Sequence, residues 1–411
     1  MQKYSKYQET DLLWMGEVPS HWRKDKISRM VEFSASGGTP TSTNESYYDG
    51  NIKWVQTGEL NDCEIFDTEK KLTEEGFKAS STKLFPAETL LVAMYGATIG
   101  KLGILKTEAT TNQACCALFF NTKKWNTKYF FYYFLNIREK LIFSSYGGGQ
   151  PNISQEVIKQ ERLFVPPFTE QTAIAAYLDQ ATANIDKVIA TKQKQLEKLE
   201  QYKQSKIHEC VTKGLNPDVT LKPSGIDWIG DVPSHWRKIK LRYEIEIQSG
   251  EFVSNTEIEA GGDFPVFGGN GIMGYVDKFN IESQRLIIGR VGAKCGNVHH
   301  VENPAWISDN ALIVATYHNY RYLFYLLTEM NLNSISSQSA QPLITGTKIK
   351  NEYVVLPPIG EQIEISEYLN DFTQNISKEK SIIEQQIEKL KQYRKCLIHE
   401  CVTGKRKVVN D

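Results

Sequence analysis

The sequence contains no long apolar run. No stretch of its 411 residues approaches the roughly 20 consecutive apolar residues that a membrane-spanning helix needs. Residues 1–11 are polar and lack the apolar core of a signal peptide. These absences argue against a membrane-embedded or secreted protein, and we expect a cytoplasmic location.

Cysteine and net charge are also scarce. The seven cysteines, two of them adjacent at 115 and 116, do not form a pattern typical of a disulfide framework, so we expect reduced thiols. The formal net charge of −1 argues against a protein coated in positive charge but leaves room for local basic faces. With 40% hydrophobic and 24% charged residues, the chain resembles an ordinary globular protein of two or three domains.

What the sequence does contain is one module written twice. The pattern Trp-x-Gly-x-Val-Pro-Ser-His-Trp-Arg-Lys at residues 14–24 recurs at 228–238, an offset of 214. Pro-Pro followed by Glu-Gln at 166–171 recurs at 357–362, an offset of only 191. The second module is therefore 23 residues shorter, and the whole difference lies between the two signatures.

Between these signatures the modules diverge. Residues 31–90 have no convincing counterpart in the second module. Fainter echoes are Gly-Ala at 96–97 and 292–293, and Gln-Pro-x-Ile-Ser/Thr at 150–154 and 341–345. We call the repeated signatures and helix of each module its frame, and the divergent residues between the signatures its variable part. This pattern is expected when the frame has the same role in both modules and the two variable parts perform two versions of another role.

The divergent parts indicate mixed α and β structure. Short apolar runs before a glycine predict strands at 89–93 and 285–289. Apolar and aromatic runs predict helices at 129–135 and 320–327. Loops are predicted at the glycine-rich segments 36–42, 147–149 and 261–274.

A long helix is predicted after each Pro-Pro pair, ending in the His-Glu-Cys-Val-Thr runs at 208–212 and 399–403. Apolar residues recur at heptad spacing with Glu, Gln and Lys between them, which is typical of an amphipathic helix with a coiled-coil seam. Lys192 and Lys206 interrupt the first seam, where their aliphatic stems can still pack. The predicted helix-pairing seam consists of Leu178, Ile185, Ile189, Leu196, Leu199, Leu369, Ile376, Ile383, Ile387, Leu390 and Leu397.

Each seam needs an apolar partner, and the duplication supplies one in the same chain. We therefore expect the two helices to pair with each other; the alternative is that each packs on its own domain. If a pseudo-twofold axis relates the modules, the paired helices run antiparallel. About 30 residues at ~1.5 Å each would span roughly 45 Å.

The doubled signatures resemble those of the specificity subunit of type I restriction–modification systems, over nearly the whole chain. The resemblance rests on Val-Pro-Ser-His-Trp at 18–22 and 232–236, on Pro-Pro with Glu-Gln, and on the matched helix endings. It implies an α+β fold in which two long helices, an antiparallel coiled coil, separate two α/β target-recognition domains with internal pseudo-twofold symmetry. The expected boundaries are a first target-recognition domain at 1–165, a first spacer and docking helix at 166–214, a second target-recognition domain at 215–355 and a second helix at 356–411.

The resemblance also implies a function. A non-catalytic DNA-recognition subunit would read a bipartite, asymmetric site, one half-site per domain, with half-sites about 34 Å apart or at a neighbouring spacing. The helices would set this gap and dock two modification (methyltransferase) subunits, which restriction (translocase and nuclease) subunits then join. No cofactor is expected on this chain; S-adenosylmethionine, ATP and Mg are expected on the partner subunits.

Several short motifs look catalytic or metal-binding, and the residues argue against each. Val-Pro-Pro-Phe at 165–168 and its twin at 356–359 resemble an amino-methyltransferase motif, but their first side chains cannot accept a hydrogen bond. Residues 96–102 are one residue short of a phosphate-binding loop and lack its Ser/Thr. The His-x-Cys pairs at 208–210 and 399–401 point roughly 200° apart on a helix. We expect no catalytic residue and no metal site.

Candidate DNA contacts come from the loops of the variable parts. Reading base edges and phosphates needs Arg, Lys, Asn or Gln, although an ordinary solvated role remains the alternative for each residue. His21 and His235, each beside a tryptophan, are expected to be structural. The DNA-binding candidates are Lys101, Asn112, Gln113 and Gln150 in the first domain, and Asn270, Arg290, Lys294, Asn310 and Gln341 in the second.

Two other functions stay open. One is a self-sufficient methyltransferase with fused recognition domains, which the missing methyltransferase motifs count against. The other is a coiled-coil DNA-binding adaptor or repressor without methyltransferase partners, which co-purification with modification subunits would distinguish.

Overall fold

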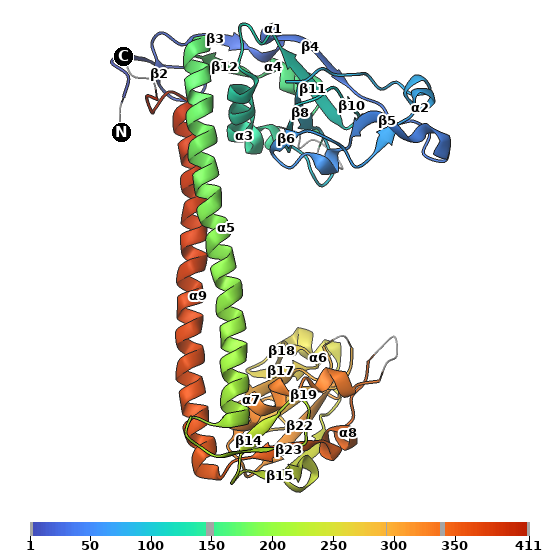
Figure 1. Ribbon diagram of the computed structural model, residues 1–411, viewed down its shortest axis with the longest axis vertical. Coiled ribbons are helices and arrows are strands. Elements are labelled where there is room, and N and C mark those ends of the chain that lie inside the picture. Colours follow the sequence, from blue (N-terminus) through green and yellow to red (C-terminus); the bar gives the residue numbers. More distant parts are fainter. Residues whose placement is uncertain (1–2, 145–151, 293, 338–341, 409–411) are drawn as a thin grey trace. The chain divides into compact units, whose positions relative to one another are not determined.

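The computed structural model describes residues 3–144, 152–292, 294–337 and 342–408 (Figure 1). The chain folds into two compact units, one formed by Met1–Thr191 with Gln385–Asp411 and the other by Lys192–Glu384. Each unit thus contains one α/β domain, the beginning of one long helix and the end of the other. The boundaries drawn from the sequence kept each helix in one piece, whereas the boundary between the units divides both helices.

A five-stranded sheet organises unit 1. Its order is β4-β11-β8-β9-β6, and every pairing is antiparallel except that of β6 with β9. A smaller sheet has the order β10-β5-β7. The strands are β4 (Val31–Ser36), β5 (Tyr48–Val55), β6 (Cys63–Ile65), β7 (Lys71–Leu72), β8 (Leu90–Ala93), β9 (Leu102–Leu105), β10 (Thr110–Thr111) and β11 (Cys115–Phe120).

Helix α3 (Thr127–Phe143) packs against this sheet and supplies the centre of the unit 1 core. The Asn126 side chain accepts a hydrogen bond from Tyr129 N at 3.0 Å and caps the helix. Tyr129, Phe130, Tyr133 and Phe134 are buried, so the aromatic run belongs to the core. The predicted strand at 89–93 and helix at 129–135 are confirmed as β8 and part of α3.

Short elements complete unit 1 around the repeated signature. Strand β3 pairs antiparallel with β12, and β1 pairs antiparallel with β2. These elements are β1 (Tyr7–Gln8), β2 (Val18–Pro19), β3 (Arg23–Lys26), α1 (Ile27–Met30), η1 (Glu45–Tyr47), η2 (Thr57–Glu59), α2 (Glu74–Lys78), α4 (Gln155–Gln160) and β12 (Arg162–Val165).

Unit 2 repeats the plan with fewer strands. Its sheets have the orders β16-β22-β19-β20 and β18-β17-β21, and β15 pairs with β23 as β3 does with β12. The strands are β13 (Leu221–Pro223), β14 (Asp231–Pro233), β15 (Arg237–Lys240), β16 (Ile245–Ser249), β17 (Phe264–Gly268), β18 (Gly271–Val276), β19 (Arg285–Gly289), β20 (Val298–Val301), β21 (Trp306–Ile307), β22 (Ala311–Thr316) and β23 (Tyr353–Leu356). The helices of the domain are η3 (Leu241–Tyr243), α6 (Asn255–Ala260), α7 (Tyr320–Glu329), η4 (Leu332–Ile335) and α8 (Gly346–Asn351). The predicted strand at 285–289 and helix at 320–327 are confirmed as β19 and most of α7.

One expectation about the variable parts is wrong. Residues 261–274, predicted as a loop, contain most of the β17–β18 hairpin, because strand pairing gives this glycine-rich backbone its hydrogen-bond partners. Residues 31–90, which have no convincing counterpart in sequence, have one in strand pairing. β4 pairs with β11 as β16 pairs with β22, and β5 runs parallel to β10 as β17 runs parallel to β21.

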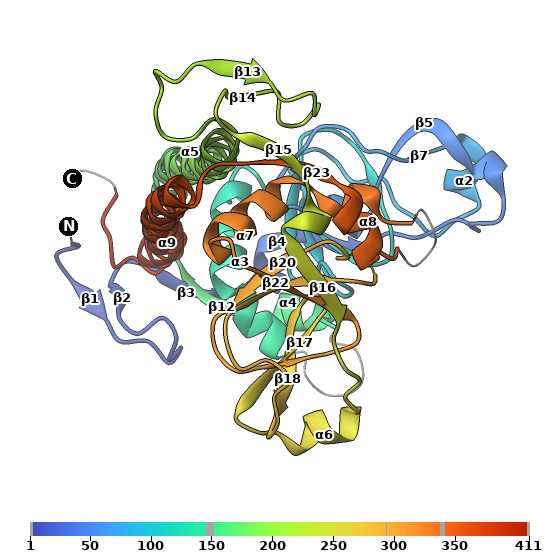
Figure 2. The ribbon, with the colours of Figure 1, turned by 90° about the horizontal axis from the view of Figure 1, so that it is seen from below.

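The two long helices are α5 (Phe168–Lys213) and α9 (Ile359–Val402), of 46 and 44 residues. At about 1.5 Å per residue each is roughly 65–70 Å long, which exceeds the length expected from the heptad run. In the view of Figure 2 they lie side by side. In unit 1, Arg406 contacts Tyr177 and Arg394 contacts Asp186; in unit 2, Lys380 contacts Glu200.

These contacts fix the sense of pairing within each unit. As α5 advances from Tyr177 to Asp186, its partners recede from Arg406, four residues past the end of α9, to Arg394 on α9, so the pairing in unit 1 is antiparallel. Unit 2 has the same sense, with Glu200 beside Lys380 and Lys206 beside Tyr368. Every predicted seam residue is buried or half-buried. Lys206 is accommodated by an ion pair with Glu209 at 2.8 Å and by the Tyr368 ring.

No helix in the described ranges is both long and apolar enough to cross a membrane. The long helices are amphipathic, with charged residues throughout.

The cysteines divide into two exposed and five buried thiols. Cys63 and Cys396 are exposed, and burial raises the pKa of Cys116 and of Cys401 to about 12. Because the thiolate is the reactive form, we expect a disulfide reagent to modify two thiols quickly in the native chain and the other five only after unfolding. Titration with a chromogenic aryl disulfide measures this. Cys63→Ser should remove one fast equivalent, and a third fast thiol in the native protein would contradict the arrangement.

Candidate nucleic-acid interface

The repeated signature builds an anchor between the start of each module and the start of its long helix. Trp22 Nε1 donates to Glu170 Oε1 at 3.1 Å, and His21 Nε2 lies 2.8 Å from Glu170 Oε2. In unit 2, Glu361 makes the same two contacts with the second His-Trp pair, at 2.5 Å and 2.9 Å. The signature therefore has a structural role: it joins the His-Trp pair to a glutamate that lies about 150 residues away in unit 1 and about 125 residues away in unit 2.

The glutamine after each of these glutamates holds the helix of the domain. Gln171 Nε2 donates to the Pro166 carbonyl at 2.9 Å, and its Oε1 accepts from Asn126 N at 3.0 Å. Gln362 repeats both bonds, with its own Pro-Pro carbonyl at 2.9 Å and with Asn319 N at 3.2 Å. Asn126 and Asn319 cap α3 and α7. The Pro-Pro-x-x-Glu-Gln motif thus has a structural role in the frame. The candidate binding residues therefore lie in the loops of the variable parts.

One loop has the same geometry in both units. It follows β8 in unit 1 and β19 in unit 2 and contains two glycines with positive φ in each copy. Gly100 N donates to Ala93 O at 2.8 Å, as Gly296 N does to Gly289 O at 2.7 Å. Residues 96–102 thus contain a tight turn, and the faint glycine echo in the sequence marks a duplicated loop.

Four candidates of unit 2 lie on loops whose backbones meet. Arg290 N donates to Asn310 O at 2.9 Å, and a Cβ on Gly269, next to Asn270, would lie 3.2 Å from that carbonyl. Lys294 belongs to the duplicated loop that begins at Arg290. Asn270, Lys294 and Asn310 are exposed, and half-buried Arg290 makes a 3.2 Å hydrogen bond to Ser249 Oγ. Unit 2 thus carries one guanidinium, one ammonium and two amides on loops whose backbones meet.

The candidates of unit 1 are more strongly tied to the protein. Lys101 Nζ lies 3.2 Å from Asp62 Oδ2, and Arg138 pairs with the same carboxylate. Asn112 Oδ1 accepts from the Ala114 backbone at 3.2 Å, and Gln113 Oε1 accepts from a threonine hydroxyl. Lys101 therefore presents a partly neutralised charge, while Asn112 and exposed Gln113 keep their amide donors.

Sequence reasoning missed a polar hollow beside Asn112. It has a volume of about 810 Å³ and includes the amides of Gln56 and Asn61. Glu59 accepts backbone hydrogen bonds from Gln56 at 2.7 Å and Glu69 at 3.0 Å, which shapes the loop. Amides are the groups that read adenine edges. The run Gln-Thr-Gly-Glu-Leu-Asn at 56–61, a glycine between amides, was the available signal.

Gln150 and Gln341 lie outside the described residues. Their flanking segments are placed: Ile153 N donates to Met94 O at 2.7 Å, and Ile344 N donates to Arg290 O at 2.9 Å. Both segments thus return to the strand end from which the duplicated loop starts.

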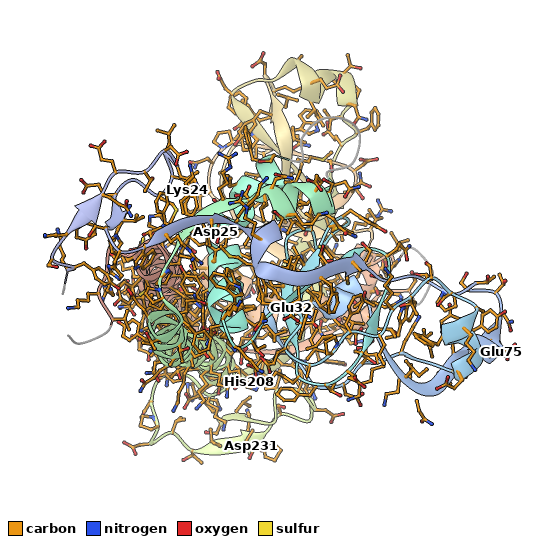
Figure 3. All side chains as sticks on the ribbon, turned by 90° about the horizontal axis from the view of Figure 1, so that it is seen from above. Lys24, Asp25, Glu32, Glu75, His208 and Asp231 are labelled. Atoms are coloured by element: carbon orange, nitrogen blue, oxygen red, sulfur yellow. The ribbon has the colours of Figure 1, made fainter. Side chains whose placement is uncertain are left out.

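The His-x-Cys pairs pack at helix ends. His208, labelled in Figure 3, has Nδ1 3.4 Å from Glu329 Oε2, and His399 Nδ1 lies 3.1 Å from Asn136 Oδ1. Burial raises the pKa of Cys210 to about 11, so its thiol stays protonated near neutral pH. Within the described ranges, no group of three or more His, Cys, Asp or Glu is arranged to hold a metal ion.

The duplicated frame and its two differing loop sets define a recognition protein of the α+β class with two related domains. A sequence model described as the type I restriction modification DNA specificity domain matches residues 19–201 and 233–389. The chain belongs to this family, the specificity subunits of type I restriction–modification systems.

Known specificity subunits resemble the chain over different lengths. The type I restriction enzyme MjaVIII specificity subunit of Methanocaldococcus jannaschii is 23% identical over 430 residues, covering 96% of this chain and 95% of that protein. The EcoprrI specificity subunit of Escherichia coli is 39% identical over 111 residues, which cover 26% of this chain and 28% of that one. The second match is higher in identity but spans less than a third of either protein.

Two solved structures share the fold. A structure described as showing complex assembly and conformational transition of the type I R-M system aligns with a TM-score of 0.75 at 16% identity, over 94% of this chain and 98% of that one. The HsdS subunit from Thermoanaerobacter tengcongensis aligns with a TM-score of 0.57 at 16% identity, over 95% and 98%. The predicted α+β fold, with two copies of the family's repeat and long paired helices, is confirmed.

Proposed function

We propose that the chain is the DNA-recognition subunit of a type I restriction–modification complex and reads a bipartite, asymmetric site, one half-site per unit. The observation that supports this most directly is the duplicated loop, which follows equivalent strands and repeats one backbone hydrogen bond in both units but carries different side chains. At this loop unit 2 offers Arg290 and Lys294, whereas unit 1 offers Lys101, whose charge is paired with Asp62. The amides of unit 1 lie around the polar hollow instead. Guanidinium and ammonium groups favour guanine edges and amides favour adenine edges, so the two half-sites differ.

The long helices are the proposed docking surface for two modification subunits and the proposed spacer between half-sites. Outside the seam, α5 and α9 expose several large apolar side chains. Single exposed apolar residues are common on protein surfaces, but a group of them on one element indicates an interaction surface. These exposed side chains are Phe168, Val188, Ile359, Ile363, Ile382 and Tyr393. Helices that pair through one face and display apolar residues on another suit binding by further helices.

Catalysis is assigned to the partners. S-adenosylmethionine would bind the modification subunits, and ATP and Mg would bind the restriction subunits that join them. The chain itself contributes no catalytic residue in this proposal: Val165 and Leu356 occupy the position where a methyltransferase needs a hydrogen-bond acceptor for the target amino group.

The test is assembly followed by methylome sequencing. We expect co-expression with the host's modification subunits to yield a stable complex of two modification subunits and one copy of this chain, and deletion of the gene to abolish one bipartite methylated motif. Arg290→Ala should relax a single base position, in one half-site only, by roughly 5- to 150-fold, the equivalent of about 1–3 kcal/mol.

Three results would count against the proposal. Absence of any complex with modification subunits would favour a DNA-binding adaptor or repressor. Methylation by the isolated chain with S-adenosylmethionine would favour a self-sufficient methyltransferase. Equal effects of Arg290→Ala on both half-sites would contradict one half-site per unit.

A further inference from the structure

The anchoring glutamate is closed off in unit 1 and open in unit 2. Glu170 and Glu361 hold the same His-Trp pair, yet the Glu170 side chain is 7% exposed and the Glu361 side chain is 35% exposed. Since the two frames are otherwise equivalent, one copy contains a group that the other lacks.

Tyr4 is the group that covers Glu170. Its hydroxyl donates to Glu170 Oε1, and its ring lies 5.6 Å from the His21 ring and 6.4 Å from the Trp22 ring. Burial, together with the hydrogen bond to Glu170, raises the pKa of Tyr4, so the phenol remains a donor at any physiological pH. Unit 1 therefore carries its own tyrosine on the anchoring carboxylate.

Unit 2 has Asp218 at the equivalent position. Strand β1 pairs Tyr7 with Pro19, and β13 pairs Leu221 with Pro233. Tyr4 and Asp218 each precede the first residue of their strand by three positions. Asp218 is exposed and does not contact Glu361 in any hydrogen bond of the described residues.

A cavity of about 380 Å³ lies where the tyrosine is missing. This volume can hold one aromatic side chain, and the Glu361 carboxylate in its lining is placed to accept a hydrogen bond from a hydroxyl. A phenylalanine would cover Glu361 without hydrogen-bonding it, at a cost in desolvation. The cavity is lined by Lys213, Gly214, Leu215, Asn216, Val219, Pro233, His235, Glu361, Glu364 and Ile365.

We propose that this cavity receives a tyrosine side chain from a modification subunit, an inference that rests on the proposed function above. The cavity is built by the last residue of α5, by the segment after it and by the first turns of α9. These are the helices proposed to dock modification subunits. Leu215 beside the cavity and Ile363 on the adjoining turn are exposed apolar side chains, which extend the contact surface. Because unit 1 fills its own pocket, the two docking sites of the chain are unequal.

The pocket is tested first with N-acetyltyrosinamide on the full chain. The Trp236 indole N–H donates to Glu361, so it reports on the cavity among the chain's seven tryptophans. We expect one indole N–H resonance to shift saturably in the wild type and none in Asp218→Tyr, which supplies the missing side chain in cis. Tyr4→Ala should open the first pocket and give two shifting resonances. N-acetylphenylalaninamide should bind at least tenfold more weakly, and absence of a shift in the wild type overturns the proposal.

Assembly with purified modification subunits tests whether the tyrosine that enters the cavity belongs to a modification subunit. Asp218→Tyr is expected to lower the affinity for them at least tenfold, as for an interface tyrosine lost from a pocket. Asp227→Tyr, at another exposed aspartate of unit 2 outside the cavity, should leave it unchanged. If the wild type assembles and Asp218→Tyr assembles equally well, this inference is wrong and the proposed function stands. If the wild type itself does not assemble, the proposed function fails.

Discussion

A chimera that carries the second variable segment in both frames is expected to direct methylation of a symmetric motif. Residues 241–352 would replace residues 27–161. The splice points are equivalent, because β3 pairs Lys26 with Arg162 as β15 pairs Lys240 with Tyr353. The half-site that we propose for unit 1 should disappear, and the half-site proposed for unit 2 should occur twice, inverted.

The frames can accept this exchange because, in each unit, the helix of the variable part contacts the end of a long helix in the same way. Tyr129 on α3 donates to the Val402 carbonyl at the end of α9, and Tyr322 on α7 donates to Val211 at the end of α5, both at 3.4 Å. Each unit thus makes the same contact to the end of the long helix that begins in the other unit. Since each mismatched base pair costs about 1–3 kcal/mol, methylation of the original motif should drop at least about a hundredfold.

Methylome sequencing of a host that lacks the native gene measures the outcome. The converse chimera, with residues 27–161 in both frames, is the control and should give the other symmetric motif. A direct instead of an inverted repeat would contradict the pseudo-twofold relationship, and an unchanged motif would place recognition outside the exchanged segments.

Ile383→Ala on α9 is expected to destabilise the chain by about 2–5 kcal/mol, whereas Ile382→Ala changes stability by no more than about 0.5 kcal/mol. The side chains are adjacent in sequence, but Ile383 is 4% exposed in the helix seam and Ile382 is 54% exposed. Truncation of Ile383 leaves a cavity between α5 and α9. Truncation of Ile382 removes few packing contacts, because more than half of this side chain is exposed to solvent. Urea denaturation followed by far-ultraviolet circular dichroism measures both.

The second substitution also separates folding from docking. If α9 binds a modification subunit through its exposed apolar face, Ile382→Ala should weaken assembly while the free chain unfolds at an unchanged urea concentration. Similar losses of stability for both variants would show that Ile382 belongs to the folded core, and unchanged assembly for Ile382→Ala would remove this position from the docking surface.

Much of the frame could be predicted from the sequence because its signals are local. Heptad spacing depends on residues seven apart on one helix, so the seam from Leu369 to Leu397 was visible without any tertiary information. The strands at 89–93 and 285–289 and the helices at 129–135 and 320–327 were likewise visible as short apolar or aromatic runs. The repeat itself required only a comparison of the sequence with itself.

The candidate binding groups were harder to predict, since they depend on which loops meet. Arg290 and Asn310 are joined through the backbone, which explains why unit 2 gathers its candidates. Lys101 looked like a free cation in the sequence and is paired with Asp62, 39 residues away. Gln56 and Asn61 lie in the part that seemed to have no counterpart, and only the pairing of β5 with β10 brought their loop beside Asn112.

By itself the sequence determined that a module is duplicated, that each copy ends in a long amphipathic helix, and that the contents differ. Only the tertiary structure decided which helix end belongs to which unit, what the signatures hold, and where a tyrosine is missing. The reason is the range of the interactions. Helix and strand patterns arise from residues a few positions apart, whereas His21 meets Glu170 across 149 residues and Trp236 meets Glu361 across 125. Pairings at that separation leave no period in the sequence, and folding alone brings them together.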